Sequence, residues 1–114
     1  MSDVITLKEN RDFHRLYKKG KSYINPVLVT YVLKNKSANL RYGITTGKKI
    51  GNAVRRSRAR RVIRAAFREL SPELKRGYDI VFVARGKTPF VKSTQIKSVM
   101  KYHFEKAQIF KDNV

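Results

Sequence analysis

The segment from Asn52 to Leu70 constrains the fold more than any other part of the chain, because its apolar and basic residues alternate with the period of a helix. At about 100° per residue, the apolar side chains gather on one side: Ala59, Val62, Ile63, Ala66, Phe67 and Leu70. The other side collects Arg56, Ser57, Arg60, Arg61, Arg64 and Arg68. Asn52 is a preferred N-cap residue, and Pro72 is expected to mark the end. The chain must therefore supply an apolar layer on which this helix docks.

A first, shorter helix is predicted near the start of the chain. Thr6 and Glu9 have the spacing of a capping box, and Gly20 is expected to end the helix that follows. This helix would carry three large side chains at helical spacing, Phe13, Leu16 and Tyr17.

Three segments read as strands. Residues 26–34 are rich in β-branched and aromatic types, and residues 40–46 alternate apolar and polar side chains. Turn-forming residues at 35–39 separate them, so we expect the two strands to pair as a hairpin. Residues 78–84 are nearly all apolar, which predicts a strand buried on both faces.

A last helix is predicted with Ser93 as its N-cap. Its apolar stripe comprises Ile96, Val99, Met100, Phe104, Ala107 and Phe110. The order helix, strands, helix, strand, helix predicts an α+β sandwich with helices packed on a small mixed sheet. We find no repeat or long linker, so residues 1–114 are expected to form one domain.

Charge narrows the class of partner. Lys and Arg number 27 against 8 acidic residues, a formal net charge of +19. No acidic residue occurs between Asp12 and Glu69, whereas 16 basic residues do. Surfaces that are merely solvated usually intersperse the two signs. This distribution favours a polyanionic partner.

The basic helix and the loop before it have the chemistry of a phosphate site. Guanidinium groups grip phosphate oxygens bidentately and stack on bases. Lys48 and Lys49 lie between two glycines, beside the positive end of the helix dipole. Charge alone does not distinguish RNA from DNA.

Several function classes are disfavoured. The chain has no cysteine, and its two histidines, His14 and His103, have no carboxylate or thiol pattern nearby, so we expect no metal site in this chain. No Ser/His/Asp set or spaced carboxylate pair indicates catalytic side chains. With neither a signal peptide nor a long apolar run, we expect a cytoplasmic protein that does not bind membranes.

Aromatic residues flank the basic block. Aromatic faces beside basic groups suit unpaired nucleotides, because bases stack on them without regard to sequence. The same spacing is common for core residues. For Phe13, Tyr17 and Tyr31 composition alone leaves the two interpretations evenly balanced.

The sequence resembles a family, the protein subunit of bacterial ribonuclease P. The similarity covers residues 7–20, the strand at 26–33, the loop and helix at 48–67 and the strand at 78–85. The segment KKIGNAV at residues 48–54, followed by the arginine-rich helix, is its most specific part.

The resemblance implies a ribonucleoprotein in which a catalytic RNA, requiring Mg²⁺, removes the 5′ leader of precursor tRNA. This chain would be an RNA-binding subunit, a monomer within the particle, binding no cofactor with its own side chains. The family fold has a left-handed βαβ crossover, against the usual preference. A cleft between the first helix and the sheet would hold the single-stranded leader.

Site residues are carried over by position. Those expected to bind the catalytic RNA are Lys48, Lys49, Asn52, Arg56, Ser57, Arg58, Arg60, Arg61, Arg64 and Arg68. Those that match the leader cleft are Phe13, Tyr17 and Tyr31. The family usually has Asn between the two arginines where this chain has Ser57, which keeps a hydroxyl but lacks the two-sided reach of the amide.

Two other functions fit parts of the pattern. A ribosomal or general RNA chaperone protein would need only the net charge, and its affinity would depend on phosphate count rather than on Phe13 or Tyr17. An enzyme acting without RNA would need a catalytic constellation, which the sequence does not offer.

Overall fold

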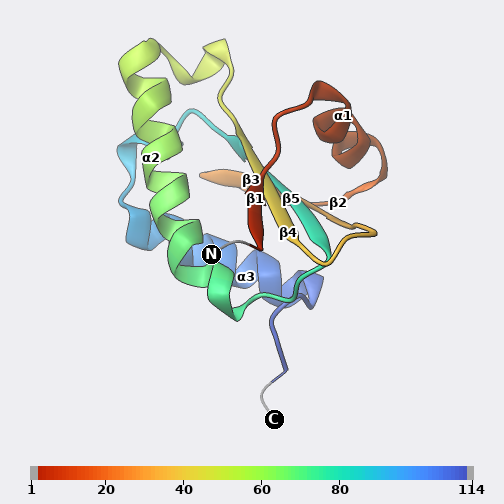
Figure 1. Ribbon diagram of the computed structural model, residues 1–114. Helices are drawn as coiled ribbons and strands as arrows, with labels where there is room; N and C mark the ends of the chain where they lie inside the picture. The colour runs from red at the N-terminus through yellow and green to blue at the C-terminus, as the bar shows by residue number, and fades with distance from the viewer. Residues whose placement is uncertain (1–2, 113–114) are drawn as a thin grey trace.

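The computed structural model describes residues 3–112 as one sheet with helices on both faces (Figure 1). Its strands are β1 (Val4–Thr6), β2 (Lys21–Asn25), β3 (Leu28–Lys34), β4 (Leu40–Thr45) and β5 (Tyr78–Ala84). Its α-helices are α1 (Asn10–Lys19), α2 (Ala53–Leu70) and α3 (Ser93–Ala107). Three short 3₁₀ helices are η1 (Lys48–Ile50), η2 (Ser71–Glu73) and η3 (Thr88–Phe90). The α+β fold expected from the sequence is thereby confirmed.

The sheet has the strand order β1-β4-β5-β3-β2. β5 occupies the centre, parallel to β4 and antiparallel to β3, while β1 pairs in parallel with β4. The predicted hairpin of residues 26–34 with 40–46 is therefore wrong, because β5 lies between those two strands. The physical reason is the apolar sequence of β5, which is stable only where both of its edges and both of its faces are covered.

The segment before β3 was not predicted as a strand. β2 forms a hairpin with β3, and Asn25 Oδ1 accepts a hydrogen bond from the Val27 amide in the turn. The strand expected from residue 26 begins at Leu28 instead. Pro26 lies in this turn, which suits a residue without an amide donor.

Helix α2 connects the parallel strands β4 and β5 and lies with α3 on one face of the sheet (Figure 1). In Figure 1 the β1 edge of the sheet faces the reader and α2 lies to the left. Seen instead from the α2 side, with β4 and β5 pointing up, β5 lies to the left of β4, so the crossover is left-handed. The main core fills the space between these helices and the sheet. Its largest fully buried side chains include Phe82, Phe104, Leu28, Leu40, Ile80 and Met100.

The prediction for α2 is confirmed at both ends. The Asn52 Oδ1 atom accepts a hydrogen bond of 3.0 Å from the Arg55 amide, and the helix ends at Leu70. The predicted apolar side is the docked side, with Ala59, Ile63, Ala66, Phe67 and Leu70 buried and Val62 partly buried.

The ends of α1 and α3 differ from expectation at the N-terminal side. Glu9 is the N-cap of α1, and Thr6 belongs to β1, where it pairs with Tyr42, so the predicted capping box is wrong. Gly20 follows α1 as predicted. Helix α3 begins at Ser93, whose predicted capping position is taken by Lys92.

Asp79 holds α1 against the other face of the sheet. Its carboxylate is fully buried and accepts hydrogen bonds from Arg41 at 2.7 Å, from Arg15 at 2.5 Å and from Asn35 at 2.8 Å. The hydrogen bonds to Asp79 raise the pKa of the Arg41 guanidinium. One side chain of the central strand thus ties together α1, β4 and the turn after β3.

Replacing Asp79 with Asn should lower the free energy of unfolding by about 3 kcal/mol, because it leaves two guanidinium groups without their buried counter-charge. Urea unfolding of the full chain measures this change. Asp12→Asn is the matched control, since Asp12 lies 3.7 Å from Arg15 and is partly exposed; its effect should stay below about 1 kcal/mol. Equal effects of the two substitutions would contradict the assignment.

His103 is a buried histidine of α3 whose Nδ1 lies 2.8 Å from the Thr30 hydroxyl. Burial lowers the pKa of this imidazole below its ordinary value of 6.5. The unfolded chain therefore binds a proton at a pH at which the folded chain does not.

The free energy of unfolding should consequently fall as the pH drops through about 6.5. The contribution of His103 to this fall should end once the pH lies below the pKa of His103 in the folded protein. Urea unfolding at several values between about pH 7.5 and pH 5.5 measures the slope. His103→Gln should flatten the slope, whereas His14→Gln, on an exposed histidine of α1, should leave it unchanged. A slope that survives His103→Gln would exclude this residue as its cause.

Candidate nucleic-acid interface

The outward side of α2 carries a row of arginines four residues apart. The row consists of Arg56, Arg60, Arg64 and Arg68, and Arg61 and Ser57 lie beside it on the exposed surface. Within residues 3–112 no carboxylate oxygen lies within 4.0 Å of the guanidinium groups of this row. Neighbours of like charge at this spacing destabilise a helix by a few tenths of a kcal/mol per pair. A bound polyanion would remove that penalty.

Two arginines of the predicted set make contacts within the protein. Arg58 points to the other flank of the helix, where its Nε donates a hydrogen bond of 2.6 Å to the Pro89 carbonyl in η3. Arg56 Nη1 donates to the Gly51 carbonyl at 2.8 Å. Arg58 thereby fixes the loop before α3, and the structure does not bring it together with the row.

The loop before α2 presents its two lysines to solvent. Lys48 and Lys49 form most of η1 and are exposed, while Ile50 is buried and anchors the turn to the core. Gly51 has φ +125°, a conformation that residues with a β-carbon rarely adopt. Asn52 uses its side-chain oxygen to cap α2, so its main observed role is structural.

The three predicted aromatics come together between α1 and the sheet, and we call them the aromatic strip: Phe13, Tyr17 and Tyr31. The Phe13 ring packs on Gly43, where a β-carbon would collide with it. Tyr17 is 38% exposed and meets Tyr31 edge-on, with ring centroids 5.1 Å apart. Phe13 is therefore mostly a packing residue, and Tyr17 is the member most open to a ligand.

The sheet face beyond the aromatic strip was missed by sequence reasoning. Ile24 of β2 is 71% exposed, and its neighbour in register, Val29, is partly exposed. His14 packs edge-on against Tyr17, with the two ring centroids 6.4 Å apart. Recognising residues 21–25 as a strand would have indicated that Ile24 and Val29 share a face, because paired strands point their matched side chains the same way.

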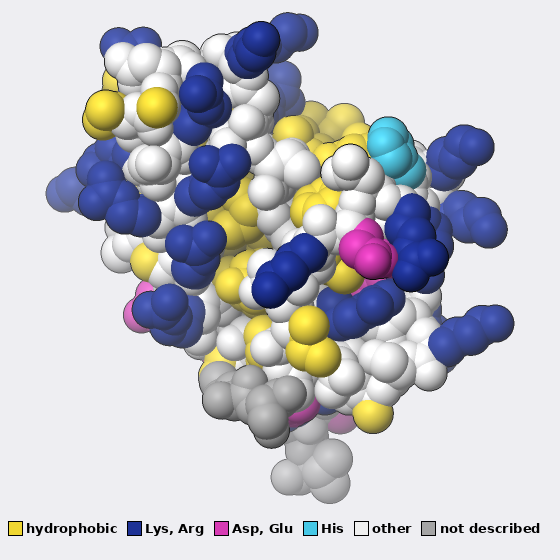
Figure 2. Space-filling model, turned by 45° about the horizontal axis from the view of Figure 1, so that its top comes forward, with side chains coloured by type: hydrophobic (Ala, Val, Ile, Leu, Met, Phe, Trp, Pro, Cys, Tyr) yellow, Lys and Arg dark blue, Asp and Glu magenta, His cyan; other side chains and the backbone are white. Residues whose placement is uncertain are grey.

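Basic side chains surround both candidate regions. In Figure 2, Lys and Arg side chains follow α2 on one side and surround α1 on the other, with hydrophobic surface between them. An unpaired strand lying on this surface would meet apolar groups at its bases and positive charge at its phosphates.

Over residues 3–112 no group of three or more His, Cys, Asp or Glu side chains is placed to hold a metal ion. Among those residues, too, none of the helices has both the length and the hydropathy to cross a bilayer.

Comparison with known proteins gives a consistent family. A family model described as Ribonuclease P matches residues 1–108. The "Ribonuclease P protein component" of Clostridioides difficile is 51% identical over 80 residues, which cover 69% of this chain and 70% of that protein. The component of the same name from Alkaliphilus oremlandii is 35% identical over the whole of both chains.

Solved structures agree with the sequence relatives. The RNase P protein of Staphylococcus aureus has a TM-score of 0.81 and 34% identity, covering 93% of this chain and 97% of that one. The RNase P protein of Thermotoga maritima has a TM-score of 0.77 and 30% identity, covering 89% and 96%. The fold that positions the arginine row and the aromatic strip is thus shared with these known proteins. The chain belongs to the ribonuclease P protein family.

Proposed function

We propose that this chain is the protein subunit of ribonuclease P and that it helps a catalytic RNA remove the 5′ leader from precursor tRNA. The observation that carries the proposal is the arginine row on α2, of which Arg60, Arg64 and Arg68 are exposed, together with the exposed Tyr17 of the aromatic strip. A large folded RNA requires many phosphate contacts, and a single-stranded leader requires stacking surfaces. The chain offers both, the phosphate contacts on α2 and the stacking surface on the α1 side of the sheet.

In this proposal the arginine row and the loop of η1 bind the catalytic RNA. Arg60, Arg64 and Arg68 are exposed, so their guanidinium groups can approach phosphate oxygens without disturbing the core. Lys48 and Lys49 extend the positive surface toward the start of the helix. Arg56 also holds the Gly51 loop in place, and Arg58 holds η3.

The leader would lie on the sheet face next to α1. Tyr17 is exposed, and Tyr31 of β3 packs against its ring. Ile24 and Val29 extend the apolar surface along the same face. Such a surface recognises unpaired nucleotides by stacking and apolar contact, and it tolerates different sequences.

The chemistry is proposed to belong to the RNA, with Mg²⁺ as a requirement of the holoenzyme. Of the acidic side chains, Asp79 is enclosed by arginines and Asp3 is paired with Arg76, so neither is free to act on a substrate. We expect the chain to work as a monomer in a cytoplasmic ribonucleoprotein.

Replacing Arg60, Arg61 and Arg64 with Gln should weaken binding to the catalytic RNA at least tenfold, because each charged hydrogen bond contributes about 1.5–3 kcal/mol. The log–log dependence of affinity on salt should become shallower by roughly 2, from about 0.7 per lost phosphate contact. Titration of labelled RNA at several salt concentrations measures both quantities.

The matched control is Lys101, Lys106 and Lys111 replaced with Gln, which removes three charges from α3 and the segment after it. That variant should alter the affinity far less. If the two triple variants weaken binding equally, net charge alone governs the interaction, as for a general RNA chaperone.

Reconstitution with the catalytic RNA should raise cleavage of precursor tRNA at low Mg²⁺, and Tyr17→Ala should reduce affinity for substrates with a leader by about 1–3 kcal/mol. Tyr102→Ala is the control, because Tyr102 is 60% exposed on α3. Substrates without a leader should bind both variants alike. Cleavage by the chain without RNA, or an equal loss on leaderless substrate, would contradict the proposal.

A further inference from the structure

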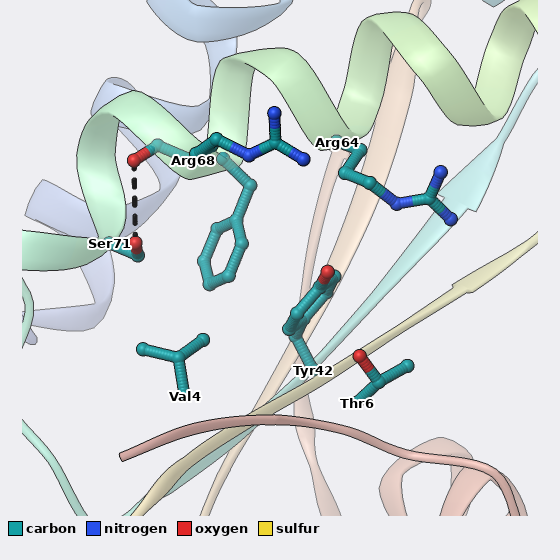
Figure 3. Close-up of a pocket in the computed structure, with 7 residues that line it drawn as sticks. Val4, Thr6, Tyr42, Arg64, Arg68 and Ser71 are labelled. Atoms are coloured by element: carbon teal, nitrogen blue, oxygen red, sulfur yellow. Dashed lines mark hydrogen bonds between the residues drawn. The ribbon is translucent and has the colours of Figure 1, made fainter. Parts of the chain in front are cut away.

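A pocket of about 320 Å³ lies between the edge strand β1 and the C-terminal half of α2 (Figure 3). This volume is at the lower end of the range for small-ligand sites, roughly 300–1,000 Å³. Seven residues line it: Val4, Thr6, Tyr42, Arg64, Phe67, Arg68 and Ser71. The pocket lies on the α2 side of the sheet, whereas the aromatic strip lies on the α1 side, so the two are different sites.

The polar groups of the pocket gather at its rim. Figure 3 shows the guanidinium groups of Arg64 and Arg68 extending over the opening, with the Tyr42 hydroxyl pointing up toward α2 and Thr6 next to it. Within residues 3–112 no protein group hydrogen-bonds either guanidinium or the Tyr42 hydroxyl. Two positive groups and a hydroxyl therefore face one opening with their donors free, an arrangement that suits an anionic group such as phosphate.

The floor of the pocket is apolar. Phe67 is 2% exposed, and its ring centroid lies 4.6 Å from that of Tyr42. Val4 of β1 closes the opposite wall. A free phosphate would satisfy the rim but leave this apolar floor in contact with water, whereas a ligand with a flat ring next to its phosphate would cover both.

We propose that this pocket holds a single unstacked nucleotide of the bound RNA, with its phosphate between Arg64 and Arg68 and its base against Val4 and Tyr42. The Tyr42 and Thr6 hydroxyls would hydrogen-bond the phosphate or the ribose. The inference rests on the proposed function and deepens it, because it assigns one end of the arginine row to a specific contact rather than to general charge. Both the catalytic RNA and the precursor tRNA could supply such a nucleotide.

Filling the pocket tests the proposal without removing charge. Val4→Phe places a ring in the space proposed for the base, so affinity should fall about tenfold for the RNA that supplies the nucleotide. Binding is measured both to the catalytic RNA and, in the holoenzyme, to precursor tRNA. Ile5→Phe is the control, because Ile5 is exposed and points to the opposite face of the same edge strand. Equal affinity of the Val4→Phe and Ile5→Phe proteins for both RNAs would overturn the proposal.

Tyr42→Phe provides a second test that keeps the ring against Phe67 and removes only the hydroxyl. The affinity for the RNA that supplies the nucleotide should fall about fivefold, while the salt dependence of binding stays unchanged because no charge is lost. If the Tyr42→Phe and Thr6→Val proteins both bind with unchanged affinity, the proposed hydroxyl contacts are overturned. If the Val4→Phe protein is unaffected as well, only general phosphate binding remains.

A photo-reactive benzoylphenylalanine at position 6 identifies the source of the nucleotide. Irradiation of the assembled holoenzyme with labelled precursor tRNA should give a cross-link to one defined nucleotide of either RNA. Cross-links spread over many nucleotides, or none to RNA, would overturn the proposal.

Failure of this inference and failure of the proposed function give different results. If the Arg60, Arg61 and Arg64 variant loses affinity while the pocket variants do not, the proposed function stands and the pocket assignment falls. If the arginine variant also binds normally, the RNA-binding role of α2 is wrong.

Discussion

The buried carboxylate of Asp79 is the interaction on which the arrangement of the molecule depends. It lies on the central strand and accepts hydrogen bonds from Arg15 of α1, from Arg41 of β4 and from Asn35. Removing a charge from water is unfavourable, and these partners compensate it only in one arrangement of helix and strands. The position of α1, and with it the aromatic strip, follows from that arrangement.

The two faces of the sheet have different tasks. Helices α2 and α3 cover most of one face, and the large side chains of the main core, among them Phe82 and Phe104, lie there. The other face carries only the ten-residue helix α1, which covers Val81 but leaves Ile24 open. Stability is concentrated on the first face, which leaves the second with apolar surface available for binding.

Local patterns in the sequence were sufficient for α2, because its cap, its apolar stripe and the proline after it all agree. They were insufficient for the sheet. Residues 26–34 and 40–46 are close in sequence and look like a hairpin, but β5, which comes more than thirty residues later, separates them. Pairing with a distant strand leaves no local signal. The same holds for the site: the arginine row could be predicted, whereas the contact of Arg58 with Pro89 and the pocket beside β1 depend on which segments meet in space.

The arginine row also affects how long an unassembled copy of the protein survives. Four positive groups at successive turns repel each other in the free chain, and a ligand that binds only the folded state shifts the equilibrium toward it by mass action. RNA therefore acts as a stabilising ligand as well as a partner. By this argument a copy of the protein bound to RNA should unfold less often than a free copy and should therefore resist proteolysis better.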